Sequence, residues 1–275
     1  MGLAAYYEAI KDDLEESALK GIIIKDDDRY QHSENYLKNC GHIFCKTNEP
    51  PENLDFIVFP FKEAIDNSIY DDRFFKALRS NIVIFSGVRN AYIANKCKEN
   101  KLEYYVLTED CSVAIKNAVP TSEGVIAYLI TNRINTVANS RVLVIGYGIC
   151  GRDLSKRMRA LGANVYAVVR NREKESLAYV DSVTPLYLDE FSENINFDIV
   201  INTVPKCILT NEMLDKLQGA IMIDIASKPH GFDIEYAKKL NKKSELLLGI
   251  PGKYAKRTAG EILGEHINNI LCRRK

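Results

Sequence analysis

The sequence predicts a two-domain α/β protein, with a doubly wound parallel sheet in its C-terminal part and a smaller α/β domain before it. The chain has 275 residues, more than the roughly 100–200 residues of a usual single domain. Short apolar runs alternate with stretches of helical periodicity, an alternation typical of βαβ units in a parallel sheet. A glycine-rich segment, Gly146–Gly151, directly follows one of the apolar runs.

We expect residues 1–118 to form the smaller domain. Apolar residues within Met1–Lys20 recur at near-helical spacing, so we expect an acidic amphipathic helix there. Short strands and helices alternate after it. The expected strands are Gly21–Ile24, His42–Cys45, Phe56–Phe59, Ile82–Phe85 and Tyr104–Leu107, and the expected helices include Asp71–Leu78 and Ala91–Glu99.

We expect residues 119–275 to form the larger domain. A connecting helix is expected from Pro120 and Thr121 to about Arg133, because proline resists helix before it and threonine is a good N-cap. A last helix, Ala255–Leu271, can cross back onto the first domain. The expected strands are Val142–Ile145, Val165–Val169, Val183–Tyr187, Asp198–Asn202, Ala220–Asp224 and Glu245–Leu248, and the helices between them are Gly151–Leu161, Glu173–Tyr179, Glu212–Leu217 and Asp233–Leu240.

Composition places the chain among cytoplasmic globular proteins. Lysine plus arginine equals aspartate plus glutamate, at 37 each, so no charge excess indicates nucleic acid or an acidic membrane surface. The seven cysteines include no C-x-x-C pair and fit buried, reduced thiols better than disulfides or a zinc site. The four histidines form no metal-ligand pattern. No apolar run approaches the ~20 residues of a membrane span, and the start of the sequence lacks the features of a signal peptide.

The glycine-rich segment predicts a dinucleotide-binding site. The first glycine permits a tight turn after the strand, the second lets a pyrophosphate approach the backbone, and the third lets the next helix pack closely. The N-terminus of that helix offers free N–H groups to the phosphates. A glycine-rich turn without a ligand is the alternative, but the flanking strands and helix favour a Rossmann domain. The expected cofactor contacts are Gly146, Tyr147, Gly148, Ile149, Cys150 and Gly151.

The end of the next strand favours NADP over NAD. NAD enzymes place an acidic residue there for the ribose 2′-hydroxyl, whereas an arginine accommodates the 2′-phosphate of NADP. Here Arg170, Asn171 and Arg172 follow the strand, and no acid occurs before Glu173. We expect these three residues to contact the cofactor, with two guanidinium groups available for charge-assisted hydrogen bonds. The alternative is that both arginines are solvated charges at a helix start.

Two further strand ends are expected to complete the cofactor site. Ligands of open α/β sheets bind at the carboxyl ends of the strands. Thr203, Val204 and Pro205 follow one strand, and Ala226 and Ser227 follow another. The alternative is that the prolines after these strands only terminate them.

A series of short motifs between residues 81 and 271 occurs in a specific order. They are Phe85-Ser-Gly87, Asn90-Ala-Tyr92, Pro120-Thr-x-Glu-Gly124, the glycine-rich segment with Leu161-Gly-Ala-Asn-Val165, Ile201-Asn-Thr-Val-Pro205, Asp224-Ile-Ala-Ser-Lys-Pro229, Pro251-Gly-Lys253 and Thr258-Ala-Gly260. Together they resemble the dipicolinate synthase A-chain family. The sequence departs from the family pattern at residues 25–29, where a Gly-Gly-Asp-x-Arg motif loses both glycines, and at residues 249–256.

The resemblance implies an enzyme of spore-forming bacteria that makes pyridine-2,6-dicarboxylate. Its substrate would be the cyclic dicarboxylate released by the dihydrodipicolinate synthase step of lysine biosynthesis. A hydride would pass from this ring to NADP, and loss of a ring proton would give the aromatic product. The resemblance also implies a partner, a flavoprotein-like second subunit, and the sequence leaves a homo-oligomer open.

The implied substrate is a planar ring with two carboxylates, and each carboxylate needs a cationic side chain or the free N–H groups at the start of a helix. Arginine binds a carboxylate through two parallel hydrogen bonds. The resemblance implies basic residues at Arg29, Arg257 and Lys228. Because we expect a helix to begin at Thr121, its free N–H groups, together with Ser122, are a further candidate carboxylate site. Charged residues on loops are more often simply solvated.

Loss of the ring proton needs a base. Glu123 and Lys228 are the catalytic candidates, and His230 ranks below them. Glu123 is also explained as a partner of a helix dipole.

Two other functions remain open. A 2-hydroxyacid or amino-acid dehydrogenase would share the two-domain plan, but we cannot place the spaced Arg, Glu and His of the hydroxyacid enzymes. A nucleotide-sensing protein without turnover would need neither a cationic substrate site nor a base opposite the nicotinamide.

Overall fold

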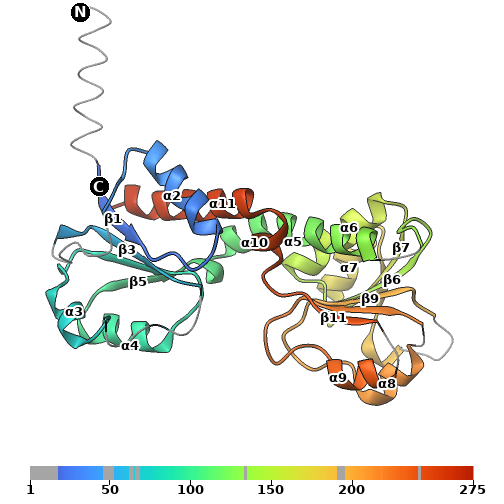
Figure 1. Cartoon of the computed structure of the whole chain (residues 1–275). Coiled ribbons are helices and arrows are strands. Elements are labelled where there is room, and N and C mark those ends of the chain that lie inside the picture. Colours follow the sequence, from blue (N-terminus) through green and yellow to red (C-terminus); the bar gives the residue numbers. More distant parts are fainter. Residues whose placement is uncertain are drawn as a thin grey trace, which may run out of the picture. The chain divides into compact units, whose positions relative to one another are not determined.

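The computed structural model describes residues 18–45, 53–61, 65, 69–132, 135–190, 196–217, 219–240 and 243–274. The chain forms two compact units (Figure 1). The first unit contains the described residues up to Ala114 and those from Lys256 onward, and the second contains those within Ile115–Ala255. Of the helix expected over Met1–Lys20, residues 1–17 lie outside the described residues, as does Arg133.

The first unit is built on a parallel sheet in the order β2-β1-β3-β4-β5. Every residue of the central strands β3 and β4 is buried, as parallel strands covered on both faces require. The bounds differ from the expected ones by at most one residue. The strands are β1 (Lys20–Ile23), β2 (Ile43–Phe44), β3 (Phe56–Phe59), β4 (Val83–Ser86) and β5 (Glu103–Val106).

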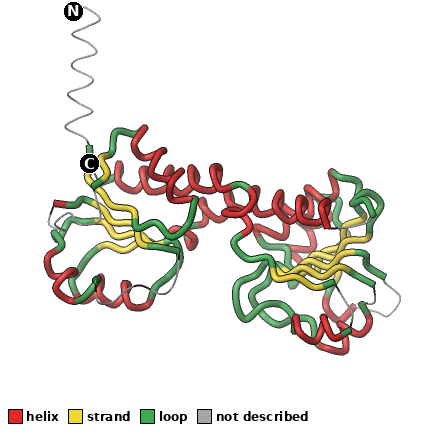
Figure 2. The backbone as a smooth tube through the Cα atoms, in the orientation of Figure 1, coloured by secondary structure: helices red, strands yellow, loops and turns green. Residues whose placement is uncertain are grey.

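Helices cover both faces of this sheet (Figure 2). Each face of the sheet carries an apolar cluster. Helices α2 and α11 contribute to the cluster on one face, and α3 and α4 contribute to the cluster on the other. Successive residues of the strands belong alternately to the two clusters. The chain thus returns at its end to the first unit, as the expected final helix allowed. The helices are α2 (Arg29–Asn39), α3 (Asp72–Ala77), α4 (Ala91–Glu99) and α11 (Lys256–Cys272), with a short 3₁₀ turn, η2 (Leu107–Glu109).

Helix α2 was not expected from the sequence. Its buried residues are Tyr30 and Leu37 together with the polar Arg29, Ser33 and Glu34. A helix whose buried face is largely polar gives no apolar periodicity to detect. The packing of α11 against it explains the burial.

Helix α5 (Cys111–Asn132) begins earlier than expected and contains Pro120 in its interior. The expected start at Thr121 is therefore wrong. Asp110 caps the true start, since its Oδ1 accepts the N–H of Ser112 at 2.8 Å. Thr121 instead donates its hydroxyl to the carbonyl of Asn117, four residues earlier, at 2.7 Å, a pattern of threonines inside helices.

The second unit contains a parallel sheet in the order β11-β10-β9-β6-β7-β8. Numbered from its first strand, this is the 3-2-1-4-5-6 order of the Rossmann fold. The order reverses at β6, which pairs with both β7 and β9. The strands are β6 (Arg141–Ile145), β7 (Asn164–Val168), β8 (Thr184–Leu186), β9 (Ile199–Asn202), β10 (Ile221–Asp224) and β11 (Ser244–Leu246).

The predicted doubly wound fold is therefore confirmed. Helices α5, α6 and α7 contribute to the apolar cluster on one face of the sheet, and α8 and α9 to the cluster on the other. No helix in the described part of the chain has both the length and the apolar character needed to cross a membrane. The remaining helices are α6 (Ile149–Ala160), α7 (Arg172–Val180), η3 (Leu188–Glu190), α8 (Asn211–Lys216), α9 (Ile234–Lys239) and α10 (Ile250–Tyr254).

Close contact between α2 and α11 depends on Gly260. A Cβ atom there would lie 2.3 Å from the carbonyl oxygen of Arg29, and Ser33 donates its hydroxyl to the Gly260 carbonyl at 2.8 Å. We expect Gly260→Ala to lower the free energy of unfolding by about 1–3 kcal/mol through this clash, although alanine is the better helix former.

The measurement is thermal and urea unfolding followed by circular dichroism. Asn269→Ala, on an exposed position of the same helix, is the matched control and is expected to be neutral or slightly stabilising. A Gly260→Ala protein as stable as the wild type would contradict the packing described.

Candidate functional site

The loop between β6 and α6 has the geometry of a dinucleotide-binding turn. Gly146 has a φ of 93°, and its N–H donates to the carbonyl of Val168 at 3.2 Å. A Cβ at this position would lie 2.4 Å from Cγ2 of Val204. Both the dihedral angle and the space therefore require glycine.

The other two glycines of the segment have different roles. A Cβ at Gly151 would lie 2.1 Å from the carbonyl oxygen of Gly146, so this glycine lets α6 meet the turn. A Cβ at Gly148 would have no atom within 4 Å among the described residues. The N-cap residue of α6 is Gly148, which has no side chain to cap the helix. The backbone of the turn is thus open at a helix N-terminus, where a phosphate group is favoured.

Tyr147 contributes to this loop through a buried side chain. Its hydroxyl donates to Oδ2 of Asp181 at 2.9 Å, and Nε of Arg152 donates to the same oxygen at 2.6 Å. Burial, together with the bond to Asp181, raises the pKa of Tyr147, while the Arg152 guanidinium lowers the pKa of Asp181. Because its hydroxyl is committed to Asp181, Tyr147 anchors the loop to the end of α7 and offers a cofactor only its backbone.

The end of β7 presents the two arginines expected to select the cofactor. Arg170 and Arg172 are exposed, and neither forms an ion pair with another residue in the described part of the chain. Asn171 between them has a structural role, since its Oδ1 caps α7 by accepting the N–H of Lys174 at 3.0 Å. The two guanidinium groups are thus available to an anion.

A buried carboxylate joins the ends of β9 and β10. Asp224 is fully buried, and its Oδ1 accepts Nδ2 of Asn202 at 3.0 Å and the N–H of Ala226 at 2.8 Å. Its Oδ2 accepts the N–H of Gly231 at 2.6 Å. Asn202 also bonds both the N–H and the carbonyl of Val204. One carboxylate therefore fixes both loops that we expected at the cofactor.

Neither Asn202 nor Asp224 was among the expected site residues. A polar residue that ends an otherwise apolar buried strand is the signal that could have identified each. The predicted Thr203, in the loop after β9, lies beside the glycine-rich turn, and its hydroxyl donates to the carbonyl of Ile145 at 2.8 Å. Pro205 and Ser227 are exposed, and Val204 is half-buried.

The catalytic candidates belong to the second unit. Lys228 is exposed in the loop after β10, and Nδ1 of His230 in the same loop lies 3.0 Å from the carbonyl oxygen of Ala226. Glu123 lies inside α5 rather than in its first turn, and its Oε1 accepts Nη1 of Arg157 at 3.1 Å.

The candidate substrate residues are divided between the units. Because α5 begins ten residues earlier, Thr121 and Ser122 are inside the helix and offer no free N–H groups; this removes the basis for a carboxylate site there. Arg257, whose side chain is 79% exposed, pairs with Glu261 at 2.9 Å in the first unit. Arg29, also in the first unit, is buried.

Comparisons with known proteins agree with this geometry. Residues 122–226 match the NAD binding domain of the D-isomer specific 2-hydroxyacid dehydrogenases. The chain is 31% identical over 246 residues to the dipicolinate synthase A chain of Bacillus subtilis (strain 168), covering 84% of this chain and 83% of that protein. The second unit is therefore a nicotinamide dinucleotide-binding domain.

Solved structures match over nearly the whole chain. The structure of that Bacillus subtilis protein is 28% identical with a TM-score of 0.85, covering 93% of this chain and 96% of that one. The dipicolinate synthase A chain from Bacillus halodurans is 25% identical with a TM-score of 0.85, covering 92% of this chain and 97% of that one.

Asp224→Asn tests the buried network. The amide NH₂ would face a backbone N–H where a carboxylate oxygen now accepts one, so we expect the free energy of unfolding to fall by about 2–4 kcal/mol. Dinucleotide affinity should fall with it, because both loops lose their anchor. Thermal unfolding and a fluorescence titration with NADPH measure the two effects.

Asp189→Asn, at an exposed position of η3, is the matched control and should change neither quantity. An Asp224→Asn protein with wild-type stability and affinity would show that the carboxylate does not hold the loops.

Proposed function

The chain belongs to the dipicolinate synthase A-chain family, and from this membership we propose that it is the dehydrogenase subunit that forms pyridine-2,6-dicarboxylate. The substrate is a cyclic dihydrodipicolinate-type dicarboxylate. The observation that carries the dehydrogenase assignment is the open backbone at Gly148, beside the uncapped N-terminus of α6. It is the position at which a Rossmann fold receives a pyrophosphate.

The bound dinucleotide supplies the hydride acceptor for this reaction. One ring C–H bond of the substrate breaks and its electron pair leaves with the hydrogen, while a second ring hydrogen leaves as a proton and the ring becomes aromatic. We assign acceptance of that proton to Lys228 or Glu123. Glu123 is paired with Arg157, so it would have to leave this partner, whereas Lys228 would have to be present as the neutral amine, which becomes an ammonium group when it takes the proton.

We propose NADP as the cofactor. Arg170 and Arg172 are exposed and unpaired in the described chain, next to the strand end that meets the ribose. Two guanidinium groups match a 2′-phosphate and give no advantage to a 2′-hydroxyl. Main-chain atoms of Gly146–Gly151, with the loops containing Thr203 and Ala226, hold the rest of the dinucleotide in this proposal.

The family also suggests where and with what the chain acts. We propose that it works in the cytoplasm of a sporulating cell with a flavoprotein-like second subunit. Arg29 and Arg257 are the proposed partners of the substrate carboxylates. Arg257 would have to exchange its bond to Glu261 for one to the substrate.

The cofactor assignment is tested by titrating the full chain with NADPH and with NADH at one salt concentration. We expect NADPH to bind more tightly, and changing both Arg170 and Arg172 to Ala to lower NADPH affinity by at least about tenfold, because charge-assisted hydrogen bonds are worth roughly 1.5–3 kcal/mol each. NADH affinity should not change.

Arg159→Ala, an exposed arginine at the other end of α6, is the matched control and should bind both dinucleotides like the wild type. Equal or tighter binding of NADH by the wild type would refute the preference for NADP, and absence of binding to either would refute the proposed function.

A further inference from the structure

Arg29 is an arginine that the first unit buries at the carboxyl end of its sheet. It is the first residue of α2, in the connection that follows β1, and only 8% of its surface is exposed. Its Nε and Nη2 donate to the two carboxylate oxygens of Asp27 at 2.7 and 2.9 Å. Its Cζ lies 3.8 Å from the centre of the Phe61 ring. The guanidinium is therefore fixed at one edge and covered on one face.

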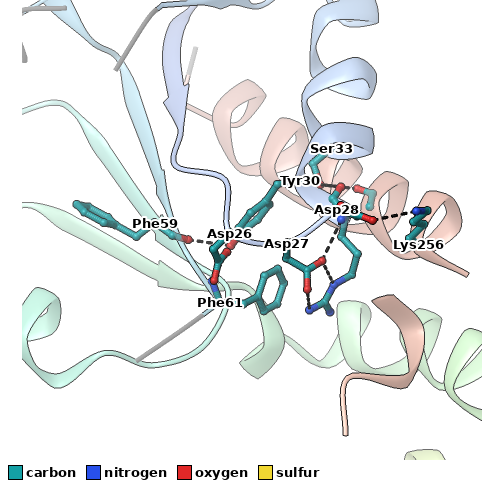
Figure 3. Close-up of polar contacts among 10 residues, drawn as sticks. Asp26, Asp27, Asp28, Tyr30, Ser33, Phe59, Phe61 and Lys256 are labelled. Carbon is teal, nitrogen blue, oxygen red and sulfur yellow. Dashed lines mark hydrogen bonds and ion pairs between the residues drawn. The ribbon is translucent and has the colours of Figure 1, made fainter. Parts of the chain in front are cut away.

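Asp27 and Phe61, the two residues that contact the Arg29 guanidinium, are fixed by further contacts of their own. Oδ1 of Asp27 also accepts the backbone N–H of Arg29 at 2.9 Å, and the hydrogen bonds from Arg29 lower the pKa of Asp27. The N–H of Phe61 donates to Oδ1 of Asp26 at 3.1 Å. The Phe61 ring packs 4.9 Å from that of Tyr30, whose hydroxyl donates to the carbonyl of Phe59 at 2.8 Å. Figure 3 draws the bond between Tyr30 and Phe59 as a dashed line and labels Asp26, Asp27 and Phe61.

The neighbouring charges are largely paired. Asp28 bonds Lys256 at 2.9 Å (Figure 3), and Lys25 bonds Glu34 at 2.5 Å. The first N–H groups of α2 are also used, since the N–H of Tyr30 donates to the carbonyl of Asp27. Attraction for an anion at this point therefore comes from the guanidinium rather than from the helix end.

One edge of that guanidinium remains for a ligand. Asp27 occupies the edge formed by Nε and Nη2, and no residue of the described chain bonds to Nη1. The edge formed by Nη1 and Nη2 is the one through which arginine also takes a planar carboxylate in two parallel hydrogen bonds. A carboxylate bound there would form charge-assisted hydrogen bonds with a guanidinium whose position Asp27 already fixes.

We propose that Arg29 is a preorganised receptor for one carboxylate of a planar dicarboxylate, and that Asp27 and Phe61 are the positioning residues that aim it. This inference deepens the proposed function and rests on it. Asp27 remains bound to Arg29 when the ligand is present. A receptor aimed in advance loses little side-chain freedom on binding, which raises affinity.

Isothermal titration calorimetry of the full chain, saturated with NADPH, tests the proposal with pyridine-2,6-dicarboxylate as the probe. We expect Arg29→Gln and Arg29→Lys each to lower affinity at least about tenfold, because lysine keeps the charge but lacks the fork. Asp27→Asn and Phe61→Leu should lower affinity by about three- to tenfold while NADPH affinity is unchanged. Pyridine-2-carboxylate should bind the wild type more weakly than the dicarboxylate does.

Arg79→Gln is the matched control, because Arg79 pairs with Asp55 in the same unit, just before β3, and it should bind the probe like the wild type. If the Arg29→Gln protein does not fold, the affinity of the Arg29→Lys protein for the probe tests the inference. Wild-type affinity in Arg29→Lys would overturn the inference, and tighter binding by Asp27→Asn would show that Asp27 competes with the ligand. If the wild type binds NADPH but not the dicarboxylate, that result would refute the proposed function itself and not only the role of Arg29.

Discussion

The buried carboxylate of Asp224 is the interaction on which the carboxyl edge of the second sheet depends. A carboxylate in the interior is costly unless several donors satisfy it, and here Asn202, Ala226 and Gly231 donate to it. Ala226 and Gly231 lie in the loop after β10, and Asn202 ends β9 and bonds Val204 in the loop that follows it. The loops are therefore coupled through one charged group and keep their shape before any ligand arrives.

Glycines allow the backbone to come close enough for this network. A Cβ at Gly231 would lie 2.1 Å from Cγ of Asn202, and one at Gly151 would overlap the carbonyl of Gly146. Gly148 differs, because the space beside it is open. The same sequence pattern thus combines two glycines required by the fold with one that leaves room for a pyrophosphate.

Most of the fold could be predicted because buried parallel strands are short and almost wholly apolar. Phe56–Phe59 has the expected bounds for this reason. Helix α2 was missed because Arg29 and Ser33 are on its buried face, and the start of α5 was misplaced because Pro120 is tolerated inside it. Asn202 and Asp224 were not predicted as site residues, because the contact that joins their side chains is a tertiary one between neighbouring strands, which periodicity does not encode.

Each unit contributes one feature to the proposal: the second contains the glycine-rich turn, and the first contains the guanidinium of Arg29 held by Asp27. The most direct test is to measure NADPH and pyridine-2,6-dicarboxylate together, in a mixture of this chain, the proposed second subunit, NADP and enzymatically generated dihydrodipicolinate. The account predicts one NADPH formed for each pyridine-2,6-dicarboxylate. Product formation at an unchanged rate without the dinucleotide, or without NADPH appearing, would contradict it.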